Sequence, residues 1–196
     1  MVSGTRTRPG GRRDAILAVA LDLFARRGYQ STGIDDIGAA LDITGPAIYR
    51  HFGSKQELLA AAFAYSFELR RQEILAAMEA GSSPRDRLEL LIRDTVHDTL
   101  EHQSVLTLYT TELGHLSPDG SRTVRRKVKE FTDVWIATLL DVFPTLPRSE
   151  ATMAVHCVQY LIATLAYTDG GLDRGRLEEL LVDMSMAALY AVSPKK

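Results

Sequence analysis

Apolar residues recur at steps of three and four positions along almost the whole chain, and this spacing constrains the fold more than any other feature. Such spacing puts the apolar side chains on one face of a helix, whereas a half-buried strand needs strict alternation. We find no alternation of useful length. The sequence therefore predicts an all-α fold of about nine helices, the first spanning residues 12–27 and ended by Gly28.

Polar residues and prolines mark the ends of the other predicted helices. These helices are expected over residues 33–41, 45–52, 55–80, 84–102, 104–113, 118–143, 149–168 and 173–192. Side chains that accept hydrogen bonds from the free amides of a first turn are expected at several helix starts. The expected caps are Thr32 paired with Asp35, Thr44, Ser54 paired with Glu57, Ser83, Ser149 and Asp173.

Residues 31–52 form the most informative segment, because their pattern predicts two very short helices joined by a tight turn. Gly38 is small enough to let the second helix approach the first closely. Asp42 falls at the turn, where a residue that tolerates the left-handed region is required. Ile48 and Phe52 are expected to point back into the core.

The second short helix leaves small and polar side chains facing outward, which suits a DNA major groove. Small residues early in such a helix let its backbone lie close to the base edges. Ala47 can contact a thymine methyl group, and Thr44 can reach a base or a phosphate. Tyr49, His51 and Lys55 have the reach for phosphates beside the groove. The full outward set is Thr44, Gly45, Ala47, Tyr49, Arg50 and His51.

Charge is distributed unevenly along the chain, although the net charge of −2 does not by itself indicate a polyanionic partner. Residues 1–60 hold eight Lys and Arg against six Asp and Glu, which gives +2, and the rest hold fifteen against nineteen, which gives −4. Arg6, Arg8, Arg12 and Arg13 lie in a stretch without acids. A polyanion is therefore expected to bind at the N-terminal end.

These motifs resemble those of a known family. Residues 12–59, which are 48 of the chain's 196 residues, are similar to the DNA-binding domain of the TetR family. The matching stretches are Gly28-Tyr29-Gln-Ser-Thr32, Ile43-Thr-Gly-Pro-Ala-Ile-Tyr-Arg-His-Phe52 and Ser54-Lys-Gln-Glu-Leu-Leu59. The Tyr-x-x-Phe pair followed by Ser-Lys is the part most specific to this family.

The resemblance implies a set of DNA contacts. Thr32 and Lys55 become phosphate contacts at helix starts. The implied DNA-binding residues are Arg13, Thr32, Thr44, Gly45, Pro46, Ala47, Tyr49, His51 and Lys55. There are two departures from the family pattern. Gly38 replaces the usual Ala, which is expected to loosen helix packing slightly, and Asp42 replaces the usual turn Gly, which it can do because Asp also adopts positive φ.

The resemblance further implies a domain organisation and an assembly. Residues 1–11 become a flexible basic arm, residues 12–54 a helix-turn-helix DNA-binding domain, and residues 55–196 an effector-binding and dimerisation domain. A homodimer is expected through the last two helices, including Leu165, because small and apolar residues there suit a four-helix interface. The aromatic residues that either line a ligand pocket or pack in the core are Phe63, Phe67, Tyr109, Trp135, Tyr160 and Tyr167.

The function implied by the resemblance is a ligand-responsive repressor of operator DNA. Residues 106–140 are similar to actinobacterial TetR-type regulators of acyl-CoA catabolism, which implies an acyl-CoA effector, with another lipophilic compound as the alternative. The basic run of residues 122–129 either suits a CoA phosphate or is a solvated face. An effector-independent DNA-binding protein and an all-helical enzyme are the competing hypotheses.

Other function classes find no support in the sequence. The chain has no nucleophile triad, metal-ligand spacing or glycine-rich phosphate loop, so no catalytic residue, cofactor or metal is expected. His97, His102 and His115 are too dispersed to predict a metal site. No apolar run approaches the roughly 18 residues of a membrane span, and the polar first residues argue against a signal peptide, so a cytoplasmic protein is expected. The single Cys157 is expected to be a buried thiol, with a redox sensor as the alternative.

Overall fold

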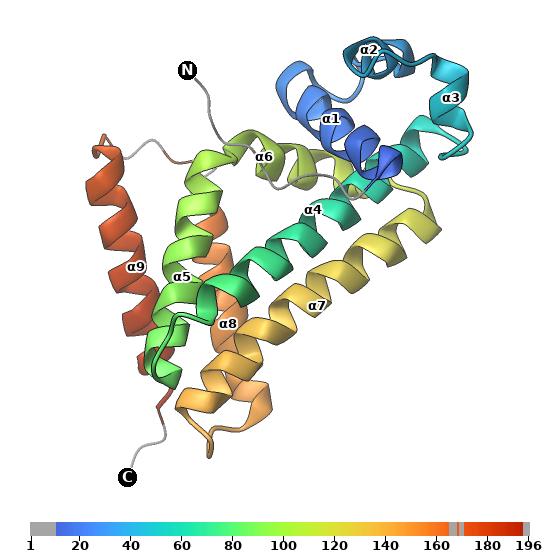
Figure 1. Cartoon of the computed structure of the whole chain (residues 1–196). Coiled ribbons are helices and arrows are strands. Elements are labelled where there is room, and N and C mark those ends of the chain that lie inside the picture. Colours follow the sequence, from blue (N-terminus) through green and yellow to red (C-terminus); the bar gives the residue numbers. More distant parts are fainter. Residues whose placement is uncertain (1–10, 165–167, 169–170, 194–196) are drawn as a thin grey trace. The chain divides into compact units, whose positions relative to one another are not determined.

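The computed structural model describes residues 11–164, 168 and 171–193, and these residues are mostly helical (Figure 1). Leu165, Tyr167 and the first ten residues of the expected basic arm lie outside this range. The helices are α1 (Arg12–Arg27), α2 (Ile34–Ala40), α3 (Gly45–Tyr49), α4 (Lys55–Met78), α5 (Pro84–Glu101), α6 (Gln103–Glu112), the 3-10 helix η1 (Leu113–His115), α7 (Pro118–Val142), α8 (Arg148–Ala163) and α9 (Arg174–Tyr190). The expected all-α fold is confirmed.

The helices group into two compact units. Unit 1 consists of the described residues up to Ser66 together with residues 107–126. Unit 2 consists of residues 67–106 and the described residues from Lys127 onward. The boundaries fall inside α4, α6 and α7, so each of these helices contributes to both units. The functional division of the chain after residue 54 stays a prediction.

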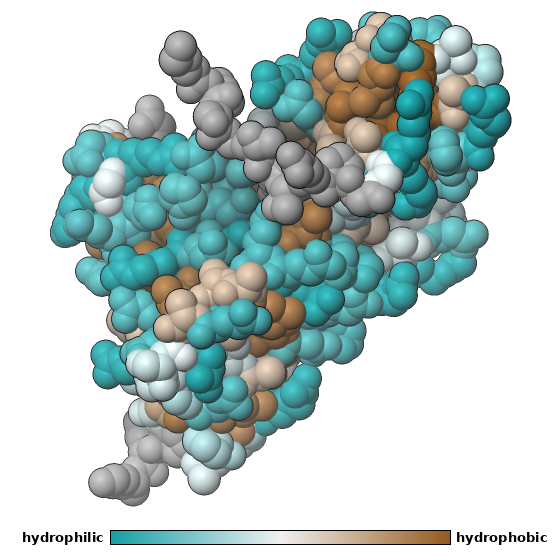
Figure 2. All heavy atoms as spheres, viewed as in Figure 1, coloured by the Kyte–Doolittle hydropathy of each residue, from teal (hydrophilic) through white to brown (hydrophobic). Residues whose placement is uncertain are grey.

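Unit 1 is built on the apolar faces of α1, α2, α3 and the first turns of α4. Its buried side chains include Ile16, Leu17, Ala20, Phe24, Ile37, Ile48, Phe52, Leu58, Leu59 and Phe63. Gly28 ends α1 with a φ of 87°, and its amide donates to the Phe24 carbonyl oxygen at 3.0 Å. Figure 2 shows hydrophobic residues gathered between α1, α2 and α3, with hydrophilic residues around them. This core fixes the two short helices.

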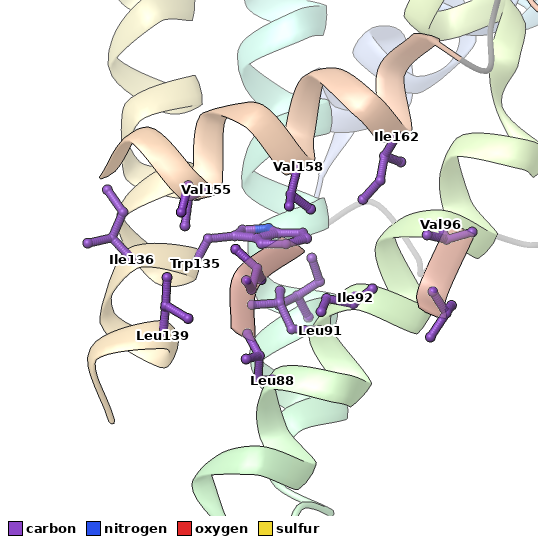
Figure 3. Packing of buried hydrophobic residues seen from close by; sticks show 14 of the residues in the cluster. Leu88, Leu91, Ile92, Val96, Trp135, Ile136, Leu139, Val155, Val158 and Ile162 are labelled. Carbon is purple, nitrogen blue, oxygen red and sulfur yellow. The ribbon is translucent and has the colours of Figure 1, made fainter. Parts of the chain in front are cut away.

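Unit 2 has one apolar core to which α4, α5, α7, α8 and α9 contribute. Trp135 of α7 is fully buried in it, beside Val155 and Val158 of α8 (Figure 3). The other members include Ile74, Leu88, Leu91, Ile92, Val96, Ile136, Leu139, Ile162, Leu181 and Leu189. Burying a side chain of this size contributes about 1.5–3 kcal/mol, so unit 2 has a substantial core of its own.

A buried arginine joins α4 to α5 in unit 2. The side chain of Arg70 is only 10% exposed. Its guanidinium lies 2.5 Å from the Asp94 carboxylate, 3.2 Å from Asp98 and 3.5 Å from Glu73. The sequence gives no sign of this cluster, because an arginine in a helix is ordinarily read as a surface residue.

Two of the expected helix caps in unit 2 are confirmed and one is wrong. Ser83 and Asp173 each accept a hydrogen bond from the backbone amide three residues later, at 3.1 Å. Ser149 does not cap α8, because that helix begins one residue earlier at Arg148, with Pro147 in the N-cap position. Proline has no side-chain acceptor, so the first amides of α8 have no side-chain cap.

The single cysteine does not lie where the sequence predicts. Cys157 is exposed, so the expectation of a buried thiol is wrong. The buried face of α8 is formed by Ala154, Val155 and Val158, and Cys157 falls on the other side of the helix. None of the helices in the described part of the chain has the length and apolarity needed to cross a membrane.

Candidate nucleic-acid interface

The turn between α2 and α3 folds as its sequence predicts. Asp42 adopts a φ of 54°, the left-handed conformation expected at this position. The amides of Leu41 and Ile43 both donate to the carbonyl oxygen of Gly38, at 3.0 and 2.9 Å. These bonds end α2 and redirect the chain sharply into α3.

Two glycines bring α2 and α3 into close contact. A Cβ on Gly38 would lie 2.6 Å from the carbonyl oxygen of Ile43, and a Cβ on Gly45 would lie 2.5 Å from a carboxylate oxygen of Asp35. The expectation that Gly38 loosens the packing is therefore wrong, since this close approach depends on its missing side chain. Gly45 is buried against α2, which removes it from the expected outward surface.

The outward side of α3 carries the other residues expected there. Thr44, Pro46, Tyr49, Arg50 and His51 are exposed, and Ala47 is partly exposed. Ile48 and Phe52 lie in the core, as predicted. Thr44 occupies the N-cap position of α3, but its hydroxyl makes no capping bond and is available to an outside partner. The surface thus offers a hydroxyl, a methyl group and the half-exposed Tyr49 ring.

Thr32 does not play the part that the sequence suggests. Its side chain is fully buried, and its hydroxyl donates to the carbonyl oxygen of Gly28 at 2.9 Å. Gly33 is the N-cap of α2, and its amide donates to the carboxylate of Asp36 at 2.7 Å. The expected Thr32–Asp35 cap is therefore wrong, and the Thr32 side chain joins the α1–α2 connection to α1. A phosphate contact of this residue stays a prediction.

Lys55 lies at the start of α4, where aromatic rings hold its side chain. Its ammonium group is 4.4 Å from the ring centroid of Tyr29 and 5.9 Å from that of Phe24. The same group donates to the carbonyl oxygen of Gln30 at 3.4 Å. Cation–π contacts of this kind restrict a flexible lysine, so the positive charge is fixed beside the α1–α2 connection.

The first turn of α4 is capped much as predicted. The amide of Glu57 donates to the Ser54 hydroxyl at 3.0 Å. The Glu57 carboxylate in turn accepts from the amide of Gly53 at 2.9 Å, one residue before the expected partner, Ser54.

Arg13 is a second cation held by an aromatic ring, since its guanidinium is 5.1 Å from the ring centroid of Phe52. Capping and stacking thus fix both ends of the α3–α4 connection.

Tyr29 contacts Lys55, although the sequence identifies it only as part of a motif. Burial raises the pKa of its phenol, and the negative charge of Glu112 raises it further. The ring therefore stays neutral while it supports Lys55. Glu112 belongs to α6 in the same unit, and no sequence pattern links it to Tyr29.

Five of the six aromatic residues considered for a ligand pocket lie in the described part of the chain, and they do not come together in one unit. Phe63 and Tyr109 make an edge-to-face contact in unit 1, with ring centroids 5.4 Å apart. Phe67 belongs to unit 2, where its ring contacts Phe131 at 6.3 Å. Trp135 lies in the core of unit 2, as described above. Tyr160 is 75% exposed on α8, which does not fit a wall inside the chain.

The basic run on α7 is largely paired with acids. Lys127 contacts Glu68 at 2.9 Å, and Arg122 and Lys129 pair with acids of their own helix. Arg125 and Arg126 are exposed. Three of the five basic residues thus have acidic partners, which favours a solvated face for most of the run.

The three histidines considered as metal ligands face separate carboxylates. His97 lies 3.5 Å from Glu178, His102 2.9 Å from Asp98, and His115 3.4 Å from Glu112. Among the described residues, no group of three or more His, Cys, Asp or Glu side chains is arranged to hold a metal ion.

Family models match both parts of the chain. The model described as bacterial regulatory proteins, tetR family, matches residues 16–62. The model described as tetracyclin repressor-like, C-terminal domain, matches residues 81–144. The first match contains α2, α3 and the start of α4, which form the surface described above.

Similar proteins agree with these matches. The HTH-type transcriptional repressor KstR2 of Rhodococcus jostii is 29% identical over 133 residues, which cover 66% of this chain and 64% of that protein. The HTH-type transcriptional activator FasR of Mycolicibacterium smegmatis is 30% identical over 101 residues, or 52% of this chain and 46% of that protein. The chain thus spans less than two thirds of the length of either relative. A transcriptional regulator of the TetR/AcrR family from Thermobifida fusca has a TM-score of 0.70 and 26% identity, covering 89% of this chain and 96% of that one.

Proposed function

The chain belongs to the TetR family of bacterial regulatory proteins, and from this membership we propose that it is a DNA-binding transcriptional repressor released from its operator by a small effector. The observation that carries the proposal is the exposed side of α3. It presents Thr44, Ala47 and Tyr49 outward while Gly38 and Gly45 lock the helix against α2. A rigid helix with small leading residues suits direct readout in a major groove.

Phosphate contacts are proposed for the cations around α3. Lys55 and Arg13 are held by aromatic rings, so little side-chain freedom is lost when they meet a phosphate. His51 and Arg50 are exposed at the C-terminal end of α3. Each phosphate contact releases counterions, so operator binding should weaken steeply as salt rises. Because operator DNA in bacteria lies in the cytoplasm, this function assigns the chain to that compartment.

A homodimer is proposed through α8 and α9. Met153 and Tyr160 of α8 are 65% and 75% exposed, and Met184 of α9 is 45% exposed. Large apolar side chains so exposed on adjacent helices favour burial against a partner. A second copy of the same chain would make this interface isologous, and two α3 helices could then read two half-sites.

Effector control is proposed to act through α4. This helix runs without interruption from Lys55, beside the DNA-facing surface, to Met78 in unit 2. An effector that binds unit 2 can therefore move the start of α4 and change the spacing of the half-sites. Our preferred effector class is an acyl-CoA or another lipophilic compound, which rests on the resemblance of residues 106–140. Coupling of this kind is typically about 1–3 kcal/mol and is reciprocal.

A selection experiment tests the proposed function. Genomic fragments of the source bacterium are incubated with the purified chain, and the retained duplexes are measured by fluorescence anisotropy. We expect the chain to bind a small set of sequences. The substitutions Thr44→Ala and Tyr49→Ala should lower its affinity for them. Arg93→Ala serves as control, because Arg93 is an exposed residue of unit 2 paired with Glu89. Retention of random fragments alone, or equal binding by all variants, would refute sequence-specific DNA recognition.

A further inference from the structure

Among the described residues, three buried side-chain groups of unit 2 that can donate a hydrogen bond have no partner: the indole nitrogen Nε1 of Trp135, the amide nitrogen Nε2 of Gln159 and the hydroxyl of Ser185. A buried donor without a partner costs about 1–3 kcal/mol, and folded proteins contain few of them. The two nitrogens lie on neighbouring helices, α7 and α8, and therefore need an explanation.

The two donors belong to the same contact between α7 and α8. The hydroxyl of Thr132 donates to Oε1 of Gln159 at 3.2 Å, which leaves the amide nitrogen of Gln159 unused. Trp135 follows Thr132 by three residues, so both lie on one face of α7. Figure 3 shows the Trp135 nitrogen at the edge of the ring that faces Val155 and Val158 of α8. Gln159 is the next residue after Val158.

The surroundings of the donors are apolar and close to the surface. Trp135, Val155 and Val158 are each no more than 1% exposed. Gln159 is only partly buried as a residue, although its amide nitrogen is covered. Gln159 therefore lies at the edge of this apolar region, with its amide nitrogen directed away from the solvent. In an apolar setting, a neutral acceptor is favoured over a carboxylate, because burying a charge without a counter-ion is costly.

We propose that Trp135 and Gln159 form a site for the carbonyl oxygen of a lipophilic effector, such as a ketone or an acyl thioester. The indole N–H and the amide N–H both donate to this oxygen, and the apolar side chains around them contact the hydrocarbon part. This inference rests on the proposed function, since it names the chemistry of the effector. It assigns specificity to Gln159, which no sequence motif identifies.

A matched pair of probes tests the site. The chain contains a single tryptophan, so the indole N–H of Trp135 gives one NMR resonance. We expect 2-undecanone to move this resonance downfield and to bind at least about tenfold more tightly than undecane, a difference of about 1.4 kcal/mol. Equal affinity for the two probes, or no binding of the ketone, would overturn the proposal.

Substitutions separate the donors from the packing. Gln159→Leu removes the amide and should weaken the binding of 2-undecanone about tenfold. Gln159→Glu should weaken this binding too, because a carboxylate has no hydrogen-bond donor. Thr138→Val is the control, since Thr138 is buried on α7 with its hydroxyl donating to the Val134 carbonyl oxygen at 2.8 Å. Unchanged ketone affinity in both Gln159 variants would overturn the site. Operator binding is measured separately, so a chain that binds the ketone but no DNA would refute only the proposed function.

Discussion

Replacing Arg70 by methionine should destabilise unit 2 far more than the same substitution at the surface. Removing one partner of a buried ion pair typically costs about 3–5 kcal/mol, because the remaining charges stay partly desolvated. The carboxylates of Asp94, Asp98 and Glu73 are 33%, 24% and 32% exposed, so water stabilises them in part. We therefore expect the free energy of unfolding to fall by about 2–3 kcal/mol, which lowers the Tm of a chain of this size by about 4–12 °C.

The control for this measurement is Arg93→Met. Arg93 is 52% exposed and lies 2.8 Å from Glu89 one helical turn away, a pair worth about 0.3–0.5 kcal/mol. Both variants lose one positive charge and gain the same side chain. Thermal and urea unfolding followed by circular dichroism give the two differences. Equal losses in the two variants would show that the burial of Arg70 contributes no stability and would refute the reasoning.

Three further predictions concern DNA binding, assembly and pH. Lys55→Ala should weaken operator binding, and in anisotropy titrations it should reduce the slope of log affinity against log salt concentration by roughly one unit. An unchanged slope would contradict the phosphate contact. Tyr160→Glu should give a folded monomer in sedimentation, whereas a stable dimer would contradict the α8 interface. A hydrogen bond from Arg71 lowers the pKa of Glu68 to about 2 from an ordinary value of 4.5, despite partial burial. The stabilisation by Glu68 is therefore complete above about pH 4.5 and lost towards pH 2. The difference in the free energy of unfolding between wild type and Glu68→Gln should shrink over that range. A constant difference would contradict the ion pair.

The helices were predictable because their signals are local. In the described part of the chain, periodic apolar residues located each α-helix but not the short η1, and Gly28, Ser83 and Asp173 marked ends through bonds to residues at most four positions away. The turn at Asp42 was predictable for the same reason. The cap predicted at Ser149 was wrong because Pro147 occupies the N-cap position and Ser149 already lies inside α8.

The wrong predictions concern residues whose surroundings are formed by parts of the chain that are distant in sequence. The spacing of Thr32 predicts a cap, but its side chain is buried, and its hydroxyl donates to the carbonyl oxygens of Leu23 and Gly28. Gly45 faces α2 because the turn brings Asp35 against it. The sequence pattern places Cys157 on an apolar stripe, yet the buried residues of α8 include Val155 and Val158, and Cys157 is exposed. The donors of Trp135 and Gln159 depend on a contact between α7 and α8, which no pattern within either helix encodes.

Methylation interference on a selected operator tests the central claim most directly, because dimethyl sulfate marks N7 of guanine in the major groove and N3 of adenine in the minor groove. The exposed side of α3 should make binding sensitive to guanine N7 methylation, in two half-sites whose centres lie about 10–10.5 base pairs apart or a multiple of that distance. Tyr49→Ala should weaken binding to the unmodified operator. Interference only from adenine N3, or from neither position, would contradict a recognition helix in the major groove.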